Sequence, residues 1–192
     1  MCGHQKRPST NMGNAAAKLN HSRWYKRNQR RLLCMGLDGA GKNTLVGYLR
    51  AHFKLVQKPL PDVGIFKFQV EKMVVTVHKL QGESQGVFYW RHHFHESQGV
   101  LFLIDLSDSV RFAQSRALVQ ELLDDPLLAK APFLILGNKA DKPNEVQDLR
   151  AALQLERYSE ERCKVAKVSV ERGEGVEEAL QWLLAAAPPA ED

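Results

Sequence analysis

The sequence predicts an open α/β fold whose central sheet is mostly parallel and carries helices on both faces. Short apolar segments alternate with amphipathic segments along the chain, a pattern typical of strand–helix–strand units. A glycine-rich loop also follows the first apolar segment directly and precedes a helical pattern, as expected where a parallel strand ends. Because ligands of such folds bind at the carboxyl ends of the strands, the residues that follow the strands are the candidates for function.

The first half of the chain predicts a strand, a helix and a hairpin. The apolar run at 31–35 ends at the glycine-rich loop and predicts a buried strand. Apolar side chains at helical spacing predict a helix over 42–53. Two prolines exclude regular structure within 54–64, so this segment is expected to be irregular. Alternating apolar and polar residues then predict the two strands of a hairpin, at 66–70 and 75–80.

The second half of the chain alternates more regularly. Apolar runs without polar interruption predict strands that are buried on both faces, and apolar residues repeated every three or four positions predict amphipathic helices. With the three strands of the first half, these runs predict a sheet of six strands. The expected strands are 100–106, 133–136 and 164–168, and the expected helices are 89–96, 111–124, 145–153 and 176–187.

Charge is distributed unevenly along the chain. Residues 1–31 contain eight Lys and Arg and no acidic side chain, a net charge of +8, whereas the remainder has 19 basic and 22 acidic residues, a net −3. An acidic body argues against nucleic acid as a partner. The basic extension at 1–30 predicts contact with an anionic membrane surface through residues 1–31. A disordered solubilising arm is the alternative.

Composition and cysteine usage indicate an intracellular globular protein. The 192 residues are 44% hydrophobic and 26% charged, which suits one domain with a full core. Cys2, Cys34 and Cys163 are odd in number and far apart, so they predict neither a disulfide framework nor a zinc site. No run approaches the roughly 18 apolar residues of a membrane-spanning helix. We expect a cytoplasmic protein without a transmembrane segment, peripheral on an intracellular membrane if its basic extension binds one.

The loop after the first strand reads GLDGAGKN and matches the phosphate-binding pattern G-x-x-x-x-G-K-[ST] except at its last position. Glycines let backbone N–H groups converge on phosphate oxygens, and the lysine adds a positive charge at the start of a helix whose dipole also favours anions. The last position, where a hydroxyl would hold magnesium, carries Asn43. The expected phosphate-binding residues are Gly36, Asp38, Gly39, Ala40, Gly41, Lys42, Asn43 and Thr44.

A second motif, GNKAD, ends at Asp141 after a predicted strand and predicts recognition of guanine. The Asp141 carboxylate can accept two hydrogen bonds, from the ring N–H and the exocyclic amine of guanine, a pattern that adenine does not offer. Asn138 is expected to brace the loops, and the aliphatic stem of Lys139 to lie on the base. Ser169 and Val170 follow the next strand, from which a backbone N–H can reach the carbonyl oxygen of the base.

Together with the run YWRHHFHESQGVLFLIDLSD at 89–108 and the final VEEALQWLL, these motifs resemble the Arf family of small GTPases, including its Arf-like and Sar branches. The resemblance implies a Ras-like P-loop GTPase domain over 31–187 that binds GTP or GDP, followed by a loose tail at 188–192. It also implies protein effectors or regulators that bind through residues 54–99, and a role in vesicle trafficking or membrane recruitment.

Family members often carry a lipidated N-terminal segment, and here the lipidation signal is altered. Gly3 follows Cys2, so the chain as written has no myristoylatable glycine directly after Met1. The run that begins at Met12 and Gly13 resembles the start of family members, which suggests that residues 1–11 are an extension. Palmitoylation of Cys2 is an alternative.

By the same resemblance, the magnesium positions of the family fall on Asn43, Asp62 and Lys79, and all three residues differ from those of the family. The catalytic glutamine becomes Glu83, and of the neighbouring glycines only Gly82 remains as a phosphate contact. Magnesium requires hard oxygen ligands, and a lysine would repel it. We therefore expect no metal, very slow or absent hydrolysis, and guanine-nucleotide binding in which the lysine takes the place of the ion. The alternative is a nucleotide-free pseudo-GTPase that acts as an interaction scaffold.

Overall fold

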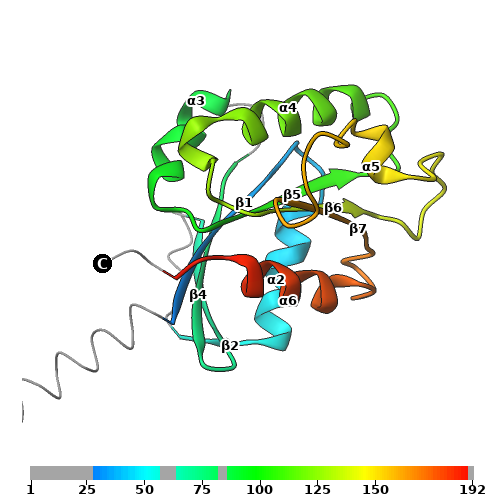
Figure 1. The fold of residues 1–192 in the computed structure, drawn as a ribbon. Coiled ribbons are helices and arrows are strands. Elements are labelled where there is room, and N and C mark those ends of the chain that lie inside the picture. The colour runs from blue at the N-terminus through cyan, green and yellow to red at the C-terminus, as the bar shows by residue number, and fades with distance from the viewer. Residues whose placement is uncertain (1–27, 57–63, 82–85, 190–192) are drawn as a thin grey trace, which may run out of the picture.

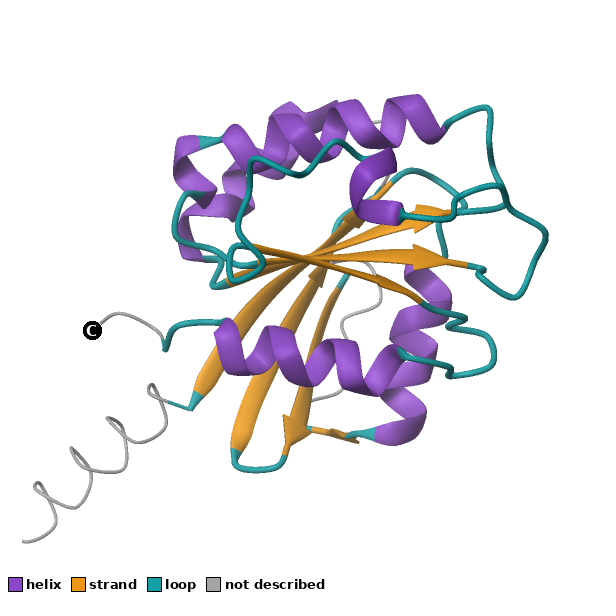
Figure 2. Cartoon of the chain, turned by 45° about the vertical axis from the view of Figure 1, so that its right-hand side comes forward, coloured by secondary structure: helices purple, strands orange, loops and turns teal. Residues whose placement is uncertain are grey.

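A seven-stranded sheet runs through the computed structural model, which describes residues 28–56, 64–81 and 86–189. Helices cover both of its faces (Figures 1 and 2). The strands are β1 (Gln29–Gly36), β2 (Lys54–Leu55), β3 (Ile65–Val70), β4 (Met73–Lys79), β5 (Gly99–Asp105), β6 (Phe133–Asn138) and β7 (Cys163–Lys167). The helices are α2 (Lys42–His52), α3 (Gly86–Trp90), α4 (Phe112–Asp124), α5 (Leu149–Ala152) and α6 (Val176–Ala186), with 3-10 turns η2 (Arg91–Glu96) and η3 (Pro126–Leu128).

The order of strands confirms the predicted α/β class. The sheet runs β2-β3-β4-β1-β5-β6-β7, and the pairs from β4 to β7 are parallel, whereas β2, β3 and β4 pair antiparallel. The helices α2 and α6 lie on one face, and α3, α4 and α5 lie on the other (Figure 1). The fold is consistent with a Ras-like P-loop GTPase.

The predicted number of six strands was wrong, because β2 was not expected. This two-residue strand lies in the segment 54–64, which the prolines suggested would be irregular. Both prolines come after it, so Lys54 and Leu55 are free to pair with Gln69 and Phe68 at the edge of the sheet. Residues 57–63 lie outside the described part of the chain.

Two helices also differ from their predicted extents. Helix α5 begins at Leu149 rather than at 145, because the Asp148 side chain accepts hydrogen bonds from the backbone N–H groups of Arg150 (2.9 Å) and Ala151 (3.1 Å) and caps the helix there. The helix expected over 89–96 is instead the end of α3 followed by the 3-10 turn η2, a change that nothing in the structure explains.

The core consists of two layers, one on each face of the sheet. Alternate residues of the central strands point to opposite layers, which is why these strands appear in the sequence as uninterrupted apolar runs. Strand β1 shows the division, since Leu32 and Cys34 pack with α2 and α6, and Leu33 and Met35 pack under α3, η2 and α4. Burial on both faces therefore fixes the pairing register of the central strands.

The parallel register brings the ends of four strands to one edge of the sheet. Cys34 of β1 pairs with Lys79 of β4, and Asp105 of β5 pairs with Asn138 of β6. The chain segments that follow these strands therefore meet at this edge, and they contain both motifs that the sequence singled out. The candidate site lies there.

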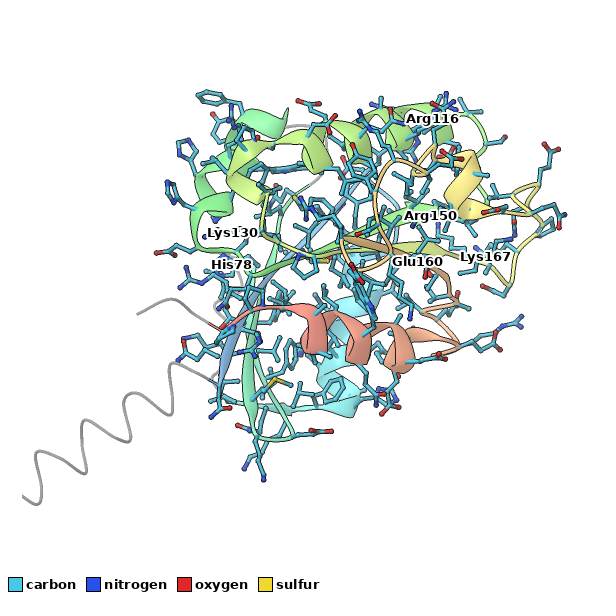
Figure 3. The ribbon with its side chains drawn as sticks, viewed as in Figure 1. His78, Arg116, Lys130, Arg150, Glu160 and Lys167 are labelled. Carbon is cyan, nitrogen blue, oxygen red and sulfur yellow. The ribbon has the colours of Figure 1, made fainter. Side chains whose placement is uncertain are left out.

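Arg150 is one of the side chains that hold the loop following α5. The Arg150 guanidinium, labelled in Figure 3, donates hydrogen bonds to the carbonyl oxygens of Cys163 (2.9 Å), Leu155 (3.1 Å) and Tyr158. A guanidinium has five N–H donors in a fixed plane, which suits it to gather several carbonyls. This contact ties the α5–β7 connection to the start of β7.

We expect Arg150→Met to lower the free energy of unfolding by about 2–3 kcal/mol, because it removes three hydrogen bonds to partly buried carbonyls. Arg116→Met is the matched control. Arg116 lies on α4 (Figure 3) and makes no hydrogen bond or ion pair within the described residues, so its loss should cost about 0.5 kcal/mol or less. Chemical denaturation of both variants measures the difference, and equal effects would contradict this role of Arg150.

Candidate nucleotide-binding site

The loop between β1 and α2 borders a cavity of about 450 Å³ at the carboxyl edge of the sheet. Most of the predicted phosphate-binding residues line it, whereas Gly36 and Ala40 do not. Gly82 and Glu83 lie outside the described part of the chain. Leu80 and Gln81, which were not predicted as site residues, line the cavity as well. The full lining is Asp38, Gly39, Gly41, Lys42, Asn43, Thr44, Lys79, Leu80 and Gln81.

The curvature of this loop is stabilised from within by Lys42. Its ammonium donates to the carbonyl oxygens of Gly36 (2.7 Å) and Leu37 (2.8 Å), and the side chain is only 8% exposed. Lys42 is also the first residue of α2, where the helix dipole favours anions. The loop therefore presents a fixed positive charge and a helix N-terminus at the cavity.

A second lysine, Lys79, lines the same cavity and bears on whether a magnesium ion fits there. Lys79 Nζ donates to Asn43 Oδ1 at 2.7 Å, so the oxygen that the resemblance assigns to a metal-ligand position already has a cationic partner. Magnesium requires several hard oxygen ligands at about 2.0–2.1 Å, and an ammonium within hydrogen-bond distance of one of them repels it. The residues present do not fit the ion. Asp62, the third of these positions, lies outside the described residues.

The base end of the site begins at Asn138, which is 3% exposed and joins two loops. Its Nδ2 donates to the carbonyl oxygen of Ala40 at 2.9 Å, and its Oδ1 accepts from the backbone N–H of Val170 at 3.0 Å. These bonds confirm the expected bracing of the loops. Gly41 makes room for it, because a Cβ at that position would lie 2.2 Å from Asn138 Nδ2.

The other predicted guanine contacts gather around Asn138, and each charged one has a partner. Lys139 forms an ion pair with Asp105, and Asp141 lies 3.6 Å from Arg172. The Ser169 hydroxyl and, more weakly, Arg172 hold the pKa of the Asp141 carboxyl below its usual value against the effect of burial. The ionised carboxylate has acceptors only, which is the form that guanine recognition requires.

Three polar residues of the site, Arg111, Asp105 and Arg172, were not predicted from the sequence. Arg111 donates to the carbonyl oxygen of Asp38 at 3.0 Å while paired with Asp108, so it supports the phosphate end. Asp105 forms an ion pair with Lys139. Its position at the end of a buried strand could have predicted that it belongs to the site. Burial raises the pKa of Asp105, but the hydrogen bonds from Lys139 and Ser107 lower it by more, so the pKa lies below its usual value.

The fold, the glycine-rich loop and the clustered GNKAD motif define a P-loop nucleotide-binding protein with the residues for guanine recognition. The chain belongs to the ADP-ribosylation factor family, whose sequence profile matches residues 16–187. It is an Arf-like small GTP-binding protein, and its membership implies guanine-nucleotide binding and effector binding. No helix in 28–56, 64–81 or 86–189 is long and apolar enough to cross a membrane.

Similarity to individual relatives is distant but extends over most of the chain. ADP-ribosylation factor-like protein 1 of Saccharomyces cerevisiae is 26% identical over 175 residues, which cover 90% of this chain and 96% of the relative. ADP-ribosylation factor-like protein 3 of the same yeast is 29% identical, covering 85% and 88%. ADP-ribosylation factor-like protein 6 of Danio rerio is 27% identical over 164 residues, covering 82% and 88%.

We expect Asn138→Ala to lower the free energy of unfolding by about 2–4 kcal/mol, because it leaves a buried carbonyl and a buried N–H unpaired. Asn144→Ala removes the same side chain where it makes one exposed hydrogen bond, to Lys142, and should cost about 0.5 kcal/mol or less. Thermal and urea unfolding of the two variants provide the comparison. If Asn138→Ala is as mild as Asn144→Ala, Asn138 does not hold the two loops together.

Proposed function

We propose that this protein binds guanine nucleotide, hydrolyses GTP very slowly or not at all, and acts by recruiting protein partners in vesicle trafficking or a related membrane process. The observation that carries this proposal is a contrast within one site. The side chains expected to recognise the base are assembled around Asn138, whereas Asn43 at the metal position is hydrogen-bonded to a lysine.

The proposed loss of hydrolysis follows from the charges at the phosphate end. Hydrolysis of GTP requires a positioned water and neutralisation of the charge that develops on the γ-phosphate. The residues at the family's metal positions do not suit a divalent ion, and Glu83 replaces the glutamine that would orient the water. A carboxylate beside phosphate oxygens repels them, so Asp62 and Glu83 would also favour GDP over GTP.

Exposed aromatic side chains support the proposed protein contacts. Phe88 and Tyr89 of α3 are 75% and 57% exposed, and the Phe88 ring meets Tyr89 and His92 edge-on. Aromatic residues are enriched at protein interfaces, where they bury a large area. They fall within 54–99, the segment for which we propose effector binding. We also propose that the basic extension, residues 1–30, contacts a membrane surface and so brings the domain of residues 31–187 to it.

Protein purified under native conditions should carry GDP or GTP, since retained guanine contacts favour a tightly held base. Mass spectrometry of the supernatant after denaturation identifies the nucleotide directly. Absence of nucleotide, together with a melting temperature that does not change when GDP is added, would instead establish a nucleotide-free scaffold.

Restoring the family residues should raise the rate of hydrolysis. We expect the triple variant Asn43→Thr, Lys79→Asp and Glu83→Gln to hydrolyse GTP at least about tenfold faster than the unmodified protein when magnesium is supplied, because the ion and the oriented water together lower the barrier. Single-turnover phosphate release measures the rate of hydrolysis of each protein. The variant Glu83→Gln alone serves as control and should gain little. An equal rate for all three proteins would count against the proposed cause of the slow turnover.

A further inference from the structure

We propose that the Lys79 ammonium takes the place of the magnesium ion and binds the phosphate oxygens of guanine nucleotide directly, so that nucleotide binding needs no divalent cation. The inference rests on the proposed function, because it requires that nucleotide is bound. It assigns Lys79 as a phosphate ligand, with a nucleoside diphosphate or triphosphate as the ligand class.

The position of Lys79 is set by backbone pairing on both sides. Its own N–H donates to the carbonyl oxygen of Gly64 at 2.7 Å, and the following N–H, of Leu80, donates to the carbonyl oxygen of Cys34 at 3.0 Å. The last residue of β4 is thus fixed between β1 and the start of β3. From this point its side chain reaches the cavity, which Lys79 lines together with Lys42 and Asn43.

The hydrogen bond to Asn43 orients the ammonium without satisfying all of its donors. A lysine ammonium has three N–H donors, and the 2.7 Å bond to Asn43 Oδ1 uses one of them. Two remain for the oxygens of a ligand, as far as the described residues show. Asn43 therefore acts as a positioning residue that holds the charge of Lys79 at the start of α2, where phosphate oxygens are expected.

The charge that Lys79 supplies equals that of magnesium together with its aspartate ligand. Magnesium and its aspartate ligand contribute a net +1 in the family arrangement, and a lone Lys79 ammonium contributes the same. With Lys42, two ammonium groups serve the phosphates. Both line the same cavity. Burial raises the pKa of the Cys34 thiol to about 12, and the charges of Lys42 and Lys79 partly oppose the rise. The two ammonium groups, of Lys42 and Lys79, can neutralise phosphate charge without a divalent ion.

The test measures dissociation of fluorescently labelled GDP from the full-length protein, with magnesium and with an excess of EDTA. We expect the two dissociation rates to agree within about twofold. Acceleration by EDTA of about tenfold or more would overturn the inference while leaving the proposed function in place. Failure to bind under both conditions would overturn the inference and the proposed function together.

Substitutions test Lys79 itself. Lys79→Met should weaken GDP affinity in EDTA by about tenfold to a hundredfold, the usual range for one charge-assisted hydrogen-bonding group. Lys67→Met is the matched control, because Lys67 lies in β3 of the same hairpin and does not line the cavity, and its affinity should stay within about twofold. Unchanged affinity in Lys79→Met would overturn the assignment.

A double variant keeps the inference testable if Lys79→Met does not fold. Asn43→Thr combined with Lys79→Asp rebuilds two oxygen ligands, and in this double variant EDTA should accelerate GDP release by about tenfold or more. Circular dichroism without nucleotide establishes that each variant is folded. Release from the double variant that remains insensitive to EDTA would show that Lys79 and Asn43 do not determine the need for an ion, which would also overturn the assignment.

Discussion

The two ends of the nucleotide site depend on one buried side chain, Asn138. It links the glycine-rich loop at Ala40 to the base loop at Val170, and the strand register supplies it at the right place, because β6 lies between β5 and β7. The spacing between the phosphate end and the base end is therefore fixed by the sheet before any ligand arrives. Preorganisation of this kind lowers the entropic cost of binding.

Several charged side chains of the site already have a polar partner. Lys139 is paired with Asp105, Asp141 with Arg172, and Lys79 with the amide oxygen of Asn43. Isolated charges in a partly closed cavity would be costly, and these partners reduce that cost. A nucleotide must then compete with these polar contacts, so its affinity depends on how much better its oxygens and ring N–H groups satisfy the same side chains.

Most of the fold could be predicted because burial leaves a periodic trace. Strands such as β5 and β6 are apolar without interruption, and the two motifs follow strand ends, where parallel register brings them together. What could not be predicted depends on local or distant contacts that have no period. Strand β2 exists through edge pairing over two residues, and α5 starts where Asp148 caps it. Arg172 reaches Asp141 from the loop between β7 and α6, and no spacing in the sequence predicts this contact.

The close approach of Gly41 to Asn138 has a consequence for how this sequence can evolve. With only 2.2 Å between a Cβ at position 41 and the Asn138 amide nitrogen, a larger residue at 41 is excluded while Asn138 is present, and the left-handed backbone at Gly41 penalises it further. A side chain at position 41 therefore becomes possible only if Asn138 is replaced as well, so the two positions are sterically coupled.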